Sequence, residues 1–214
     1  MNDSVPTVEE RRQQYREGMI EDILAIAREM MQKDGVAALS FNGIARRLGM
    51  KPPSLYTYFD SKNAIYDELF RRGFIEFGRQ MDESVRQKGP LRDELQSVME
   101  TYMRFAQENA DLYQLMFQRP VPGFEPSEES MAVSLARLED ARRQFADVLR
   151  SNELSIGLPF AEALDLFLAL QHGLTELHLA NDPDRPVGEG RFGKLISPAV
   201  QLILDAWQKG QEPK

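Results

Sequence analysis

The sequence predicts an all-α protein of about nine helices, and three observations support this fold class. Apolar residues recur at the three- and four-residue spacing of an amphipathic helix along most of the 214 residues. No run alternates apolar and polar residues between turn signals, as a half-buried strand does. Segments rich in proline and glycine separate the periodic stretches. With 42% hydrophobic residues the chain can bury a core, so we expect a globular protein.

The first expected helix runs over about residues 16–33. Its apolar residues fall on one face, and Gly35 follows where a C-terminal cap is expected. The apolar face comprises Ile20, Ile23, Leu24, Ala27, Met30 and Met31. Residues 1–15 are polar and charged and are expected to form a flexible N-terminal arm.

Two short helices are expected next. Ser40 is a suitable N-cap for a helix over about residues 41–48, which Gly49 ends. The two prolines at positions 52 and 53 fit only a turn or the first turn of a helix, so the third helix is expected over about residues 53–59. A helix this short is marginal by itself and must be held by its neighbours.

A long fourth helix and a domain boundary follow. Either Asp60 or Ser61 caps this helix, which extends to about Gln87, and Gly89 with Pro90 then breaks the chain. Further helices are expected at about 91–109, 110–117, 127–151, 159–180 and 195–209. The predicted divisions are an arm (1–15), an N-terminal three-helix domain (16–62), a connecting helix (63–88) and a C-terminal helical bundle (89–214).

Charge is distributed unevenly along the chain. The 26 basic and 34 acidic residues give a net charge of −8, which taken alone argues against nucleic acid as a partner. Residues 36–62 nevertheless carry four basic residues against one acidic residue, a local charge of +3, and the remainder after Lys62 carries −8. The positive charge therefore lies beside the two short helices.

Composition also limits the function. No cysteine is present for thiol chemistry or disulfides, no glycine-rich phosphate loop follows a strand, and two histidines leave little for a catalytic triad, so no enzyme and no cofactor are expected. The N-terminal segment is polar where a signal peptide needs an apolar run, and no stretch approaches about 18 apolar residues. We expect a cytoplasmic protein without a membrane partner.

The two short helices have the spacing of a helix-turn-helix. The major groove of B-DNA is about 12 Å wide and admits one helix, whose exposed N-terminal residues meet base edges, so a short third helix is sufficient. Leu55 and Phe59 lie four residues apart and would face inward, whereas Tyr56 and Thr57 would face outward.

The segment "ALSFNGIARRLGMKPPSLYTYFDSKNAIYDEL" resembles the DNA-binding signature of the tetracycline-repressor (TetR) family of bacterial transcription regulators. The resemblance extends over about residues 20–69, and its most specific parts are "IARRLG", "LYTYF", Lys62 and Ile65 in one register. It implies a homodimer whose paired third helices enter successive major grooves of a palindromic double-stranded DNA operator. It also implies a divergent C-terminal domain that senses a small-molecule effector.

Site residues follow from the resemblance position by position. Those that would hold phosphates are Ser40, Tyr56, Tyr58 and Lys62, and those that would read base edges are Lys51, Pro53, Ser54 and Thr57. Two alternatives remain open. One is that the tyrosines only cover the core. The other is that Arg11, Arg12 and Arg16 reach the minor groove as an arm, although three nearby glutamates oppose them.

The C-terminal helices are rich in aromatic residues and methionine, a composition that suits a pocket for an apolar or aromatic molecule. The expected ligand-binding residues are Phe70, Phe74, Tyr102, Phe105, Tyr113, Met116, Phe117, Leu135, Phe167, Gln171 and His172. An ordinary core is the alternative for each of them, and only the family resemblance favours a cavity.

Gln171, His172 and Gly173 resemble the Trp-His-Gly element of one subgroup of TetR-family C-terminal domains. His172 and Glu176 lie four residues apart, but no third and fourth ligand of the usual kind is near, so no metal site is expected. A buried histidine satisfied by its neighbours is the alternative to a ligand contact.

The last two long helices are expected to form the dimer contact, as they commonly do in this family. The sequence as a whole favours a ligand-responsive repressor that a small apolar or aromatic effector releases from its operator. The alternative is a helical small-molecule-binding or sequestering protein with only non-specific DNA attachment. An activator, or a regulator without a ligand, also stays open.

Overall fold

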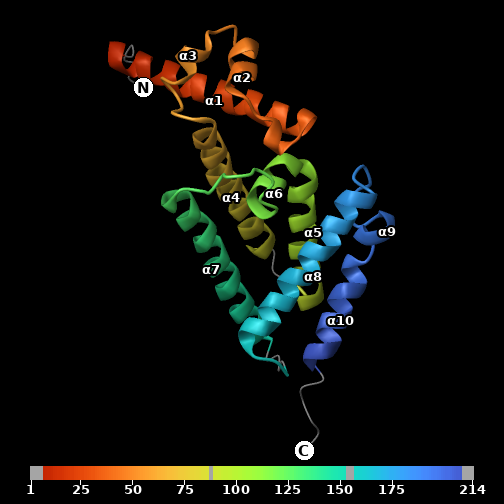
Figure 1. The fold of residues 1–214 in the computed structure, drawn as a ribbon. Helices are drawn as coiled ribbons and strands as arrows, with labels where there is room; N and C mark the ends of the chain where they lie inside the picture. Colours follow the sequence, from red (N-terminus) through yellow and green to blue (C-terminus); the bar gives the residue numbers. More distant parts are fainter. Residues whose placement is uncertain (1–6, 87–88, 153–156, 209–214) are drawn as a thin grey trace, which may run out of the picture. The chain divides into compact units, whose positions relative to one another are not determined.

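The computed structural model describes residues 7–86, 89–152 and 157–208, and the described residues are helical without a strand. The chain divides into two compact units. Unit 1 comprises the chain up to Gly73 together with Asp111–Met131, and unit 2 comprises Phe74–Ala110 and the chain from Ala132 onward. Figure 1 shows the elements of both units, which are described separately below.

Unit 1 contains the N-terminal helices and one later helix. Its elements are α1 (Val8–Asp34), the 3₁₀-helix η1 (Val36–Ala38), α2 (Phe41–Arg47), α3 (Pro52–Leu55), the first part of α4 (Lys62–Arg86), α6 (Ala110–Phe117) and the start of α7 (Glu128–Ser151). The predicted stripe on α1 is confirmed: all its members except Ile20 are buried. They share a core with Ile44, Leu55 and Ile65, each of which is fully buried.

The first helix is longer than predicted. It begins at Val8, so the part of the expected flexible arm from Val8 to Tyr15 is helical, and the arm's first six residues lie outside the described part. The reason is a capping box: the Glu10 amide donates to the Thr7 hydroxyl at 3.2 Å, and the Thr7 amide donates to the Glu10 carboxylate at 2.6 Å. These bonds satisfy amides that a helix otherwise leaves unpaired at its start.

Unit 2 is a helical bundle. Its elements are the remainder of α4 and of α7, then α5 (Leu91–Glu108), α8 (Phe160–Asn181), α9 (Gly190–Gly193) and α10 (Ile196–Gln208). Residues of α5, α7, α8 and α10 form one buried cluster, with Met99, Phe145, Leu164 and Val200 among its members. The Arg92 guanidinium also donates to Ser197 and Gln201, which joins α5 to α10.

Each of the nine predicted helices is present among the described residues, and the structure adds two short ones, η1 and α9. Glycine and proline around residues 183–193 predict only a connecting loop. In the structure the Asp182 carboxylate accepts the Arg191 amide at 2.8 Å, and Gly193 lies against the His178 ring, where an added Cβ would come within 3.1 Å of Nδ1. These contacts join residues that are well separated in the sequence. They stabilise the single helical turn α9, which local sequence patterns do not indicate.

No helix in the described part of the chain combines the length and the apolar character that crossing a bilayer requires.

Candidate functional site

The frame of the helix-turn-helix depends on close packing between α1 and α2. The Ser40 hydroxyl accepts the Gly43 amide at 3.1 Å and caps α2, as predicted. A Cβ at Gly43 would lie 2.7 Å from the Met30 methyl group and 2.8 Å from the Ser40 hydroxyl, so a larger residue here would force these two side chains to shift. Gly49 has φ +67°, a left-handed conformation that glycine adopts without strain, and it turns the chain towards α3.

The third helix is held by two apolar side chains. Leu55 is fully buried and Phe59 is buried, so both face inward as predicted. The regular helix ends at Leu55 instead of Phe59, because hydrogen bonds that span three residues, such as the Tyr58 amide to the Leu55 carbonyl at 2.9 Å, replace helical ones. Lys51, Pro53, Ser54, Tyr56 and Thr57 are exposed.

Tyr56 leans on the start of α2. Its ring centroid lies 4.9 Å from that of Phe41, but 58% of the residue is exposed. Tyr56 therefore does not serve to cover the core, and its hydroxyl lies on a ring whose position Phe41 fixes. The Thr57 hydroxyl donates to the Ser54 carbonyl, which orients its methyl group relative to α3.

Arg16 joins α1 to the end of α3. Its guanidinium donates to the Thr57 carbonyl at 2.6 Å, and its Cζ lies 5.5 Å from the centroid of the Tyr58 ring. Tyr58 is half-buried, so this predicted phosphate-binding residue is also part of the support for α3. From the sequence alone, the only role predicted for Arg16 is in an arm that reaches the minor groove.

Lys62 lies at the first residue of α4, and its ammonium is 5.7 Å from the centroid of the Tyr66 ring. The Ser61 hydroxyl accepts the Ala64 amide at 3.1 Å, so Ser61 caps this helix. The Tyr66 hydroxyl donates to the Val36 carbonyl at 2.6 Å, and burial raises the pKa of Tyr66. Tyr66 thus fixes the helix that carries Lys62.

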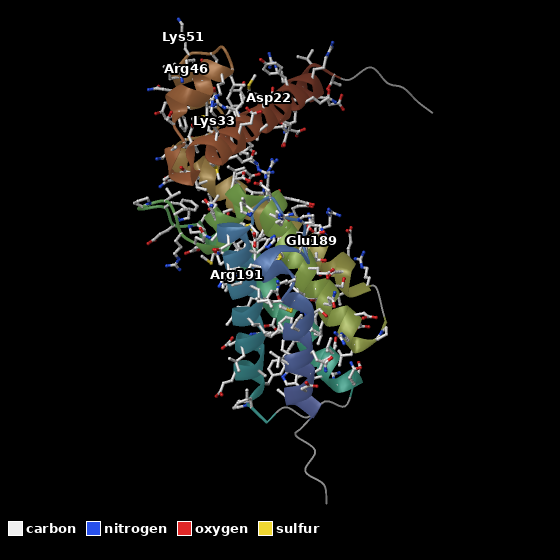
Figure 2. All side chains as sticks on the ribbon, turned by 90° about the vertical axis from the view of Figure 1, so that its right-hand side faces the viewer. Asp22, Lys33, Arg46, Lys51, Glu189 and Arg191 are labelled. Atoms are coloured by element: carbon white, nitrogen blue, oxygen red, sulfur yellow. The ribbon has the colours of Figure 1, made fainter. Side chains whose placement is uncertain are left out.

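Basic side chains project from this part of unit 1. Figure 2 shows Lys51 and Arg46 beside each other at the α2 and α3 end, with Lys51 directed away from the helices. Both residues are exposed. An exposed positive group next to exposed Ser54 and Thr57 can approach phosphates while the short polar side chains approach bases.

An ion pair within unit 1 was not predicted from the sequence. Both carboxylate oxygens of Asp111 on α6 accept from Arg28 on α1, at 2.8 and 3.0 Å, and one accepts from Gln32 at 3.2 Å. The Asp111 side chain is fully buried. An aspartate in the first turn of a helix usually serves the helix terminus, so no local pattern indicates a partner 83 residues away.

The predicted ligand-binding residues are divided between the units. Phe70, Tyr113, Met116 and Phe117 belong to unit 1, and the other seven belong to unit 2. Within unit 1, the rings of Tyr113 and Phe117 lie 5.2 Å apart. Leu135 is 58% exposed and does not share the burial of Phe74, Tyr102, Phe105, Phe167 and Gln171.

Within unit 2, aromatic rings from α4, α5 and α8 meet. Phe77 packs edge-on against Tyr102 and Phe105, with centroid distances of 5.5 and 5.1 Å. The Tyr102 hydroxyl forms a hydrogen bond with His172 Nδ1. Burial lowers the pKa of His172, and the Glu176 carboxylate opposes that effect only in part. A mainly neutral histidine and a tyrosine therefore form a polar pair among apolar side chains.

Large apolar side chains are exposed on α8 and α10. Leu166 is 59% exposed and Leu202 is 70% exposed. A groove of about 440 Å³ lies beside them, and Phe167, Leu170 and Trp207 contribute to its lining. In the described part of the chain, no group of three or more His, Asp or Glu side chains is arranged to hold a metal ion.

Comparison with known sequences gives one family match. Residues 23–69 match the family described as "Bacterial regulatory proteins, tetR family". Over 93 residues, 43% of this chain, the sequence is 32% identical to the uncharacterized HTH-type transcriptional regulator YobS of Bacillus subtilis (strain 168). The aligned part spans 48% of YobS, about half the length of that relative.

Solved structures of other proteins resemble most of the chain. The putative regulatory protein SCO4313 gives a TM-score of 0.71 at 22% identity, covering 94% of this chain and all of that one. The transcriptional regulator FadR from Bacillus subtilis, solved in complex with stearoyl-CoA, gives 0.64 at 17% identity, covering 87% of this chain and 98% of FadR. With the family match at residues 23–69, these likenesses show that the chain has the fold of a TetR-family transcriptional regulator.

Proposed function

We propose that the chain is a ligand-responsive, sequence-specific DNA-binding transcription regulator. In this proposal a homodimer represses transcription from a palindromic operator, and a small apolar or aromatic effector releases it. The observation that carries the proposal is the exposed face of α3. Lys51, Ser54 and Thr57 are open to solvent on α3 and directly beside its two ends, and the buried Leu55 and Phe59 anchor this segment in the core.

The division of labour among the side chains follows from their supports. Three of the predicted phosphate-binding residues are supported by a neighbouring side chain: Tyr56 by Phe41, Tyr58 by Arg16, and Lys62 by Tyr66. Their polar ends are therefore held in place at the edge of the helix-turn-helix. We assign phosphate contacts to these three and to Ser40, whose hydroxyl already caps α2 and whose neighbouring amides remain for an anion. Base contacts are assigned to Lys51, Pro53, Ser54 and Thr57.

The homodimer is supported by the apolar faces of α8 and α10. Large side chains such as Leu166 and Leu202 are exposed there, and burying one leucine stabilises by about 1.5–3 kcal/mol. If two copies of the chain pack together through these faces, the leucines become buried. The pairing would also set the distance between the two helix-turn-helix motifs of the dimer. Half-sites about one helical turn apart would then match a two-fold symmetric protein.

The effector class is supported by the core of unit 2. Phe77, Tyr102 and Phe105 offer aromatic surface, and the Tyr102 and His172 pair offers one polar contact. The likeness to FadR, which was solved with stearoyl-CoA, also supports a mainly apolar ligand. An assignment to the Trp-His-Gly subgroup stays a prediction. No residue is assigned a catalytic role.

The test is selection of bound sequences from a random duplex pool by the purified protein at two salt concentrations. A palindromic consensus with half-sites about one turn apart is the expected result. Weak binding without a consensus, which disappears as salt rises, would leave only charge attraction. The non-specific sequestering alternative would then replace the proposal.

A further inference from the structure

The first turns of α1 divide their charges between two faces. From Val8 to Glu17 every residue is exposed. At 3.6 residues per turn, Arg11, Arg12 and Arg16 fall within an arc of about 140° that also contains Val8 and Tyr15, whereas Glu10 and Glu17 fall on the opposite side and Glu9 borders the arc next to Arg16. We call the first of these the α1 basic face, defined by Arg11, Arg12 and Arg16. Two of the three glutamates that offset the arginines in the count of charges therefore lie on a different face.

One member of the α1 basic face already contacts the end of α3. Arg16 donates to the Thr57 carbonyl and lies over the Tyr58 ring. Arg12 is one turn earlier on the same side, about 6 Å along the axis at a rise of about 1.5 Å per residue. The arginine side chains that precede Arg16 thus lie on the side of α1 that is next to the residues proposed to contact DNA.

Arg11 and Arg12 make no ion pair with any residue that the structure describes. Two of the three nearby glutamates are engaged otherwise. The Glu10 carboxylate accepts the Thr7 amide, an interaction that lowers the pKa of Glu10, and Glu17 accepts from Gln13 at 2.7 Å. Two adjacent positive groups are therefore held in solvent beside α3.

We propose that the α1 basic face is a second DNA-binding element, in which Arg11 and Arg12 bind backbone phosphates flanking the bases under α3. This inference rests on the proposed function. Arg16 fixes the orientation of the face through Thr57. The capping box at Thr7 and Glu10 makes the segment helical before DNA is bound, so the arginines do not act as a flexible arm.

The helical conformation of this part of α1 also determines which part of the DNA duplex its arginines bind. An α-helix with its side chains is about 10–12 Å across, whereas the minor groove is about 6 Å wide. Arginines carried by a helix therefore meet the phosphates at the edge of the groove and not its floor. Phosphate contacts carry no sequence information, so this element contributes affinity and register but not base preference.

The test compares Arg11→Gln/Arg12→Gln with the parent on a random-sequence duplex and on the selected operator. Glutamine has nearly the helix propensity of arginine, so α1 is retained, and circular dichroism checks this. The matched control is Arg142→Gln/Arg143→Gln, which removes two adjacent exposed arginines from α7 in unit 2. The readout is the slope of log affinity against log salt concentration.

The expected result is a salt slope that is smaller by about 0.9 for each phosphate that is no longer bound, or about 1.8 for each head, with the consensus unchanged. The control variant keeps the parent slope. A slope equal to that of the parent or the control overturns the proposal. A changed consensus with the parent slope also overturns it, because the arginines then read bases. If the parent itself binds no duplex, the proposed function fails, and this inference fails with it.

Discussion

The two units handle polar and apolar groups in opposite ways. In unit 1 the α3 region exposes Lys51, Ser54 and Thr57 and buries a compact apolar support, with Leu55 and Ile44 wholly inaccessible. In unit 2, α8 and α10 expose large leucines, and the interior contains Gln171 and Thr175 as well as the Tyr102 and His172 pair. A surface that binds phosphates must be polar, whereas a surface that binds a second copy is apolar at its centre.

The units also differ in how they are fixed internally. Unit 1 uses directed polar links between helices, namely Arg16 to Thr57, Tyr66 to Val36 and Arg28 to Asp111. Unit 2 combines one large apolar cluster with polar links such as Arg92 to Ser197 and Gln201. Directed links hold the helix-turn-helix in one geometry, and an interior that is largely apolar can adapt to a ligand.

The largest effect is expected from Leu202→Asp. The substitution places a charge on the exposed apolar face of α10, so we expect the dimer to dissociate, with association weakened by about 3–6 kcal/mol over the two copies. Light scattering at micromolar concentration measures this. Leu135→Asp is the matched control, another exposed leucine but on α7, and it is expected to stay dimeric. Equal behaviour of the two variants would remove the special role of α8 and α10.

A smaller effect is expected from Asp111→Asn. The amide cannot accept both hydrogen bonds from Arg28 as a carboxylate does, and the site is buried, so we expect a decrease of about 2 kcal/mol in the free energy of unfolding. Urea denaturation measures it. Asp147→Asn removes an exposed pair with Arg150 and should cost less than about 0.5 kcal/mol. Similar decreases in both variants would show that burial does not strengthen the pair.

The variant Lys62→Ala tests whether Lys62 binds a DNA phosphate. Affinity for all DNA sequences should fall about equally, and the salt slope should fall by about 1 for each contact. Titrations of operator and random duplex at several salt concentrations measure both quantities. The control is Lys33→Ala, which removes a lysine from the last turn of α1. An unchanged slope and affinity in the Lys62 variant would exclude it as a phosphate contact.

The smallest effect concerns the polar pair in unit 2. The pKa of His172 is lowered by burial, so the unfolded chain binds this proton more readily below its ordinary pKa of 6.5, and stability falls as pH drops through that value. His172→Gln should remove this part of the pH dependence, a difference of less than about 2 °C in Tm. Thermal scans from about pH 7 to pH 5.5 compare the proteins. A variant with the parent's full pH dependence would assign it to other groups.

Local signals in the sequence predicted the helix-turn-helix well. Ser40, Gly49 and the two prolines fix the ends of α2 and α3, and the spacing of Leu55 and Phe59 indicates the buried side. The same kind of signal at Thr7 and Glu10, a capping box, marks the start of α1 but is obscured by the charged composition around it.

The remaining features depend on residues far apart in the sequence. Asp111 lies in the first turn of α6, and nothing near it indicates Arg28. The contact of Arg16 with Thr57 joins residues 41 positions apart, and α9 is held by Asp182 and His178 from the preceding helix. Periodicity shows which face of a helix is buried, but it does not identify the polar partner that the fold brings to it.

Base reading by α3 is best tested by a second selection from the random duplex pool with Thr57→Val. This variant replaces the hydroxyl, which donates to the Ser54 carbonyl, with a methyl group of similar size on an exposed position, and circular dichroism checks that the fold is retained. If α3 reads bases, the consensus changes at one symmetric position in each half-site, and the spacing between half-sites stays the same. A consensus identical to the parent's at every position would show that the hydroxyl of Thr57, two residues after α3, does not read bases.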